Sequence, residues 1–162
     1  ESSASLTQKY SNLITVMTYS KSRSMAGSRL GFAIANEELV KDLEKIKYST
    51  NPYSINRLTN LAGIAAIKDS AYYEENCKKI VETREFTKSE LKKLGFEMTD
   101  SKSNFIFAKN SRIGGEELYK KLKDKGILVR HFSKARIKDY VRITVGTREQ
   151  MEILLNVIKG II

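Results

Sequence analysis

The sequence is poor in the residues that mark several classes of protein. Its 162 residues include no tryptophan, one proline (Pro52), one histidine (His131) and one cysteine (Cys77). A lone cysteine excludes a disulfide framework and fits a reducing compartment, so we expect a cytoplasmic location. No apolar run reaches the length of a membrane span, and no secretory signal is visible. We therefore expect no membrane partner, and we assign no metal site.

Charge is unbalanced, with 29 Lys and Arg against 19 Asp and Glu, a formal net charge of +10. A nucleic-acid partner must be considered for so basic a chain. The lysines of segments 41–47, 78–93 and 120–125 mostly alternate with acidic residues, which is typical of solvated helix faces. We therefore expect no nucleic-acid partner. A basic α+β module that binds nucleic acid without catalysis stays open as an alternative.

Hydrophobic periodicity, together with glycine and proline residues that end helices and strands, predicts an αβ chain in two parts. Residues 1–70 are predicted as the end of an α/β domain, and residues 71–162 as a small α+β domain with its own sheet. The predicted strands are 12–17 (buried), 30–35, 96–99, 104–108, 127–131 and 140–145. Two helices are predicted over 55–67 and 70–94, and a third between Gly115 and Gly126. Two more are predicted to begin after the N-cap Asn36 and after a capping box at Thr147–Gln150.

The segment 18–31, which reads TYSKSRSMAGSRLG, carries the most chemistry. A lysine amine captures an aldehyde as a Schiff base, and hydroxyls and a guanidinium suit a phosphate dianion. Lys21, Thr18, Ser20 and Arg29 supply these groups directly after a predicted strand, where α/β folds place ligands. The alternatives are a solvated lysine in a serine-rich loop, and hydroxyls that only form turns. We assign Arg23 no role.

This segment resembles the lysine motif of the fold-type-I pyridoxal-phosphate enzymes, and among them the histidinol-phosphate aminotransferases. A second match covers 126–132 (GILVRHF) and 140–147 (YVRITVGT). The resemblance runs over essentially the whole chain in the family's order. Ser28 departs from the apolar residue expected there, and Ser103 stands for alanine in the family's Ala-Asn-Phe stretch. We read Asn104 and Phe105 as structural and give His131 no role.

The resemblance implies the C-terminal part of the aspartate aminotransferase-like fold, namely the end of the large domain and the small domain. It implies pyridoxal 5'-phosphate held by Lys21, Thr18, Ser20 and Arg29, with Lys21 as the catalytic residue. Arg130 and Arg142 would bind the substrates, histidinol phosphate and glutamate or 2-oxoglutarate, although alternation alone makes Arg142 an outward strand residue. The implied activity is transamination in histidine biosynthesis by a homodimeric full-length protein.

The resemblance also implies that further parts of such a site precede Glu1. These include the aspartate that pairs with the pyridine nitrogen and the aromatic residue stacked on the cofactor ring. We therefore expect the 162-residue chain to be inactive by itself. A sister enzyme of the same fold that decarboxylates threonine phosphate is the nearest alternative, since it too must bind a phosphate and a carboxylate.

Overall fold

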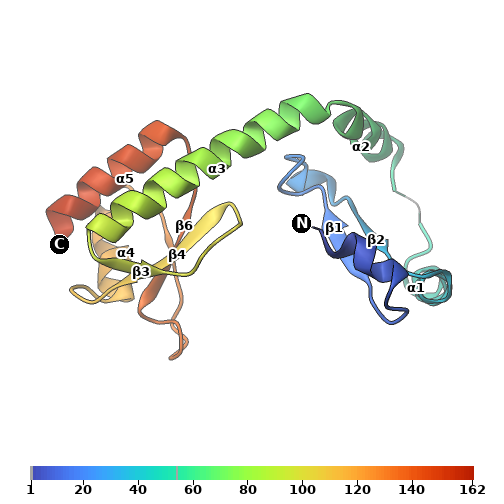
Figure 1. Ribbon diagram of the computed structural model, residues 1–162, viewed down its shortest axis with the longest axis horizontal. Coiled ribbons are helices and arrows are strands. Elements are labelled where there is room, and N and C mark those ends of the chain that lie inside the picture. Colours follow the sequence, from blue (N-terminus) through green and yellow to red (C-terminus); the bar gives the residue numbers. More distant parts are fainter. Residues whose placement is uncertain (1, 54) are drawn as a thin grey trace. The chain divides into compact units, whose positions relative to one another are not determined.

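The computed structural model describes residues 2–53 and 55–162 and divides into two compact units (Figure 1). The first unit extends to Glu74 and the second comprises Glu75–Ile162. The division falls within the long helix α3, Ser70–Lys93, so the helix begins in one unit and ends in the other.

The first unit contains a two-stranded ribbon and helices. Its elements are η1 (Ser3–Gln8), β1 (Thr15–Thr18), η2 (Ala26–Ser28), β2 (Gly31–Ile34), α1 (Glu37–Thr50), α2 (Arg57–Lys68) and the first turn of α3. Strands β1 and β2 pair antiparallel, with Thr15 opposite Ile34 and Thr18 opposite Gly31. The prediction that the first strand is buried is wrong, because Val16 is 72% exposed. A two-stranded ribbon cannot bury both of its faces by itself.

Local capping explains where the helices of the first unit begin. The Asn36 side chain accepts a hydrogen bond from the Leu39 amide at 2.9 Å, which confirms the predicted N-cap of α1. Helix α2 begins at Arg57 rather than residue 55, because Asn56 caps it by accepting from the Thr59 amide, also at 2.9 Å. Both caps satisfy amides that the helix itself leaves without partners.

The second unit is a four-stranded antiparallel sheet with helices. It contains the rest of α3, then β3 (Phe96–Met98), β4 (Phe105–Asn110), α4 (Gly115–Asp124), β5 (Arg130–His131), β6 (Tyr140–Thr144) and α5 (Arg148–Ile161). The strand order is β3-β4-β6-β5. The predicted strand 127–131 is reduced to two residues, since the Ile127 amide donates to the Leu122 carbonyl and is thereby part of the end of α4.

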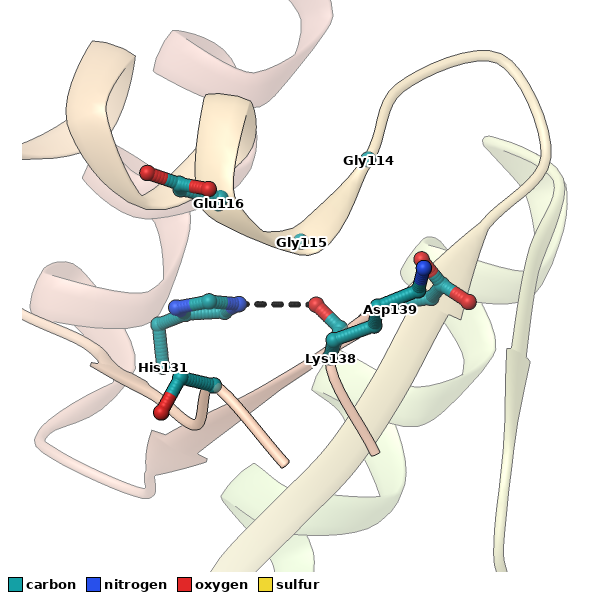
Figure 2. Close-up of a pocket in the computed structure, with 7 residues that line it drawn as sticks. Gly114, Gly115, Glu116, His131, Lys138 and Asp139 are labelled. Atoms are coloured by element: carbon teal, nitrogen blue, oxygen red, sulfur yellow. Dashed lines mark hydrogen bonds between the residues drawn. The ribbon is translucent and has the colours of Figure 1, made fainter. Parts of the chain in front are cut away.

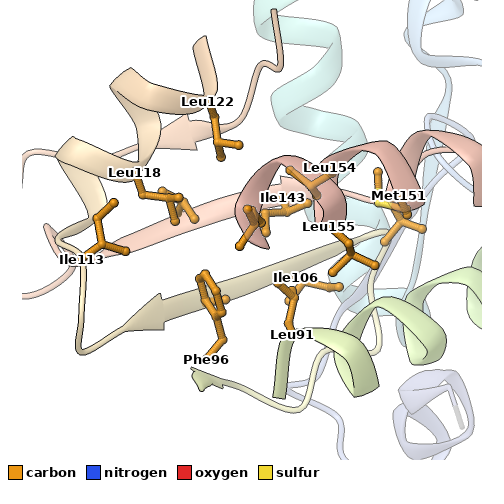
Figure 3. Close-up of a cluster of buried hydrophobic side chains, with 14 residues drawn as sticks. Leu91, Phe96, Ile106, Ile113, Leu118, Leu122, Ile143, Met151, Leu154 and Leu155 are labelled. Atoms are coloured by element: carbon orange, nitrogen blue, oxygen red, sulfur yellow. The ribbon is translucent and has the colours of Figure 1, made fainter. Parts of the chain in front are cut away.

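One apolar core holds the second unit together (Figure 3). It joins one face of the sheet to α3, α4 and α5, through Ile106, Ala108, Val141, Ile143, Leu91, Leu118, Leu122, Met151, Leu154, Leu155 and Ile158. Helix α3 ends before Gly95, whose positive φ of 81° closes the helix in the left-handed conformation. The predicted capping box is confirmed, with Thr147 and Gln150 bonded reciprocally at the start of α5.

Candidate functional site

The loop that joins β1 to β2, residues 19–30, is called the lysine loop here because it carries Lys21. Its two arms are closed by a hydrogen bond from the Tyr19 amide to the Leu30 carbonyl at 3.0 Å. Directly beyond this bond, Thr18 and Gly31 form the last pair of the ribbon. Thr18 and Ser20 therefore lie on one arm and Arg29 on the other, at the same end of the ribbon.

Lys21 begins a tight turn inside this loop. The Ser24 amide donates to the Lys21 carbonyl at 3.1 Å, and the Met25 amide donates to the Tyr19 carbonyl at 3.1 Å. Ser24 has a φ of 53° and Arg29 a φ of 54°, both in the left-handed region. Such conformations are strained for residues other than glycine and concentrate at functional sites. The Lys21 side chain itself is exposed.

Thr18 and Arg29 both contact their own loop and keep donors to spare. The Thr18 Oγ1 accepts a hydrogen bond from the Ser20 amide at 3.1 Å, which is the turn-forming role left open by the sequence. A hydroxyl that accepts can still donate its own proton. The Arg29 Nη1 donates to the Ala26 carbonyl at 3.2 Å, and a guanidinium has five N–H donors. Turn formation and anion binding are thus compatible at both residues.

This donor set fits a ligand that carries an aldehyde and a phosphate. The Tyr19–Leu30 bond brings the hydroxyls of one arm and the guanidinium of the other to the same end of the ribbon. Hydroxyls and a guanidinium are suitable partners of a phosphate dianion. Lys21 lies between them in sequence and supplies the amine that an aldehyde requires.

Arg130 and Arg142 lie side by side in the second unit. They are direct partners in the register of β5 with β6, and both are exposed. Like charges directly opposite each other destabilise a strand pair. An anion held between the two guanidiniums would remove that repulsion, so the pair is suited to a carboxylate or a phosphate. The alternation predicted for 140–145 is confirmed, with Val141 and Ile143 buried and Arg142 and Thr144 exposed.

Two aromatic rings support these arginines, and the sequence reasoning did not find them. The guanidinium carbon of Arg130 lies 5.8 Å from the centre of the Phe132 ring, and that of Arg142 lies 5.6 Å from the Phe105 ring. Phe132 follows Arg130 by two positions, a strand spacing that could have indicated the contact. Phe105 belongs to β4 and is brought near Arg142 only by the pairing of β4 with β6.

His131 faces a separate pocket between the start of α4 and the chain before β6 (Figure 2). Its Nε2 lies 2.7 Å from the Lys138 carbonyl oxygen, and its ring stacks on Tyr119 at 6.2 Å. Glu116 also lines this pocket, and a hydrogen bond from Lys120 holds the pKa of that carboxyl below its usual range. These contacts are those of a packed histidine, and they give His131 no chemical role.

The predicted site residues fall into two groups. Lys21, Thr18, Ser20 and Arg29 are in the first unit, while Arg130 and Arg142 are in the second. Among the described residues, no group of three His, Cys, Asp or Glu side chains could hold a metal ion. The helices of the same residues include none long and apolar enough to cross a membrane.

The curated relatives of the chain share one name. The chain is 57% identical over all 162 residues to a histidinol-phosphate aminotransferase of Brachyspira hyodysenteriae, of which it covers 46%. It thus spans about half the length of the curated relatives it matches.

Solved structures also match nearly the whole chain over about half of their own length. The histidinol-phosphate aminotransferase of Clostridium acetobutylicum matches 97% of the chain and 48% of its own length, with a TM-score of 0.86 and 28% identity. A decarboxylase of Sulfurospirillum multivorans matches 99% of the chain and 47% of its own length, at a TM-score of 0.84 and 27% identity.

A family model describes nearly the whole sequence. The model of aminotransferase class I and II matches residues 1–158, which include the lysine loop and both substrate-binding candidates. The chain belongs to the aminotransferase class I and II family.

Proposed function

We propose that this chain is the C-terminal part of a pyridoxal-phosphate-dependent aminotransferase of histidine biosynthesis. The full-length protein would transfer an amino group between histidinol phosphate and 2-oxoglutarate. One observation carries the proposal: Lys21 lies in a loop whose closing bond, Tyr19 to Leu30, brings Thr18 and Arg29 to the same end of the ribbon. The names of curated relatives, at 46–57% identity in the first cases, support the choice of substrates.

The lysine loop would hold the cofactor. Bound pyridoxal phosphate supplies an electron sink for the substrate's breaking C–H bond. Lys21 Nζ would hold the aldehyde carbon until the substrate amine takes its place there. The lysine amine so released would then move a proton, as general base and acid, at the substrate's amine-bearing carbon. Thr18, Ser20 and Arg29 would bind the phosphate through their hydroxyls and guanidinium.

The arginine pair would hold the anionic end of each substrate. Glutamate has a carboxylate beside its amine carbon, and histidinol phosphate has a phosphate ester in the corresponding place. A guanidinium can donate two parallel hydrogen bonds to either group, so we assign Arg142 to both substrates. Arg130 adds the second cation that a phosphate dianion favours. Holding this end fixes the orientation of the bond that breaks.

The same proposal extends to organisation. Residues 1–70 would be the end of the large cofactor-binding domain and residues 71–162 the small domain. The full-length protein would be a cytoplasmic homodimer that acts on small molecules. The 162-residue chain would be inactive alone, because the family's partner for the pyridine nitrogen and its ring-stacking residue would lie elsewhere in the full-length protein.

Decarboxylation of threonine phosphate is the second candidate, and the structural likeness to a decarboxylase favours keeping it. Both reactions need a phosphate site and a lysine. They are separated by their products, because transamination gives an amino acid from 2-oxoglutarate whereas decarboxylation releases CO2. A basic nucleic-acid-binding module would instead show binding to random duplex DNA that falls steeply with salt.

Borohydride reduction of the full-length protein with bound cofactor tests the proposal. Peptide mapping should find the pyridoxyl label on Lys21. Replacement Lys21→Ala should abolish the label and lower turnover by at least about a thousandfold. The matched control is Lys41→Ala, on the exposed surface of α1, which should keep both. A label on Lys9 or Lys41 in the unaltered protein would contradict the proposal.

A further inference from the structure

Arg23 has no role assigned from the sequence, but it makes a long-range contact next to the proposed cofactor lysine. Its guanidinium carbon lies 5.1 Å from the centre of the Tyr73 ring, and both side chains are half-buried. Tyr73 stands in the first turn of α3, and both residues belong to the first unit. The other cation–ring contacts of this unit, Lys9 with Tyr10 and Lys47 with Tyr48, join only sequence neighbours.

The segment that this contact holds is the strained part of the lysine loop. Arg23 directly precedes Ser24, which has a positive φ of 53°. The Ser24 amide in turn donates to the carbonyl of Lys21. A non-glycine residue stays in this conformation only where its surroundings fix it. The hydrogen bond fixes the turn from one side. The contact with Tyr73 joins Arg23, one of the two residues between Lys21 and Ser24, to a regular helix.

We propose that Arg23 is a positioning residue: its guanidinium, which lies over the Tyr73 ring, holds the turn that presents Lys21. This inference rests on the proposed function for the role of Lys21, but the contact itself does not. A planar guanidinium stacks on an aromatic face better than a compact ammonium does. Arg23→Lys should therefore be only a partial replacement, whereas Tyr73→Phe keeps the ring and should preserve the contact.

Limited trypsin digestion without cofactor or substrate tests the contact directly. In the full-length Tyr73→Leu protein, both tryptic sites of the turn, Lys21 and Arg23, remain. Their cleavage should become several-fold faster relative to cleavage after Lys123 in the second unit, a ratio that corrects for general unfolding. Tyr73→Phe and the control Tyr48→Leu should leave the ratio unchanged. An unchanged ratio in Tyr73→Leu overturns the proposal.

Kinetics of the full-length enzyme test the consequence for Lys21. Arg23→Leu should lower kcat about tenfold and change KM for either substrate by less than about twofold, because the reactive amine is displaced while the arginine pair is intact. The matched control is Arg57→Leu, an exposed arginine of the same unit, which should keep the original kcat.

Coupling between the two residues completes the test. The Arg23→Leu/Tyr73→Leu double variant should lose no more kcat than the worse single variant, because both changes remove the same contact. Additive losses, or an unchanged kcat in Arg23→Leu, overturn the positioning role. If the unaltered protein catalyses no amino transfer yet loop cleavage responds as expected, the proposed function fails and the Arg23–Tyr73 contact is supported.

Discussion

The two units use similar amphipathic helices, but only the second buries their apolar faces. In α5 the apolar residues Met151, Leu154 and Ile158 are all buried. In α2, Leu58 is 79% and Leu61 58% exposed, although their spacing is equally helical. Within the described part of the first unit, Ala66 is the only buried apolar side chain. A helical stripe therefore indicates a face that packs, and the presence of a core depends on what packs against it.

The two units also differ in how their strands are covered. The second unit has a sheet with one face covered by three helices, an arrangement that supports cooperative folding. The first unit carries the strained lysine loop on a two-stranded ribbon with exposed apolar residues such as Val16.

A leucine-to-alanine substitution should lower the free energy of unfolding much more in the second unit than in the first. Leu122→Ala empties a position that is 0% exposed in α4, so the free energy of unfolding should fall by about 2–5 kcal/mol. Leu61→Ala in α2 removes a side chain that is largely in water, so the free energy of unfolding should change by less than about 0.5 kcal/mol. Urea unfolding of the chain, monitored by hydrogen exchange of peptides from 57–68 for Leu61→Ala and from 96–155 for Leu122→Ala, measures both. Equal losses would show that α2 is packed as firmly as α4.

Substrate affinity should be sensitive to the second unit, while cofactor attachment is not. In the full-length protein, Arg142→Ala should lower kcat/KM for both substrates by about one to two decades, the worth of a charge-assisted bidentate contact of roughly 1.5–3 kcal/mol. Arg130→Ala should affect mainly histidinol phosphate. Neither change should remove the borohydride label from Lys21. Equal losses for glutamate and histidinol phosphate in Arg130→Ala would refute its role at the phosphate.

The smallest effect concerns an ion pair that ties α3 to the loop before β4. Lys88 donates to Asp100 at 2.8 Å, and this hydrogen bond lowers the pKa of the Asp100 carboxyl and raises that of Lys88. A lowered carboxyl pKa stabilises the fold above the unfolded-state pKa, and this stabilisation is lost as pH falls through the folded-state pKa. For Lys88 the sign is opposite, and its contribution is lost only as pH rises above the usual lysine range.

Asp100→Asn should therefore lower the unfolding midpoint at pH 7, and the gap from the unaltered chain should narrow as pH falls below about 4. The control in the first unit is Asp42→Asn, which removes an exposed pair with Lys45 on α1. Exposed ion pairs of this kind contribute little to stability, so the unfolding midpoint of Asp42→Asn should equal that of the unaltered chain. A gap for Asp100→Asn that is unchanged at pH 3 would contradict the assignment.

The sequence alone predicted the elements that depend on near neighbours. Asn36 and Thr147 cap their helices, and Gly95 ends α3, because a side chain or a free φ acts on amides and carbonyls within a few residues. The family was inferred from two motifs, and the family model that matches residues 1–158 confirms the family. The roles of Lys21 and the arginines stay predictions, since no comparison or contact tests them.

Tertiary structure alone decided whether an apolar face finds a partner and which distant residues meet. The strand predicted as buried lies exposed at Val16, and the predicted strand 127–131 pairs only at Arg130 and His131. The juxtaposition of Arg130 with Arg142, and of Arg23 with Tyr73, depends on strand register and on where a helix packs. Side-chain spacing fixes a residue's face on its own element, but the partner of that face is chosen by packing between segments far apart in the chain.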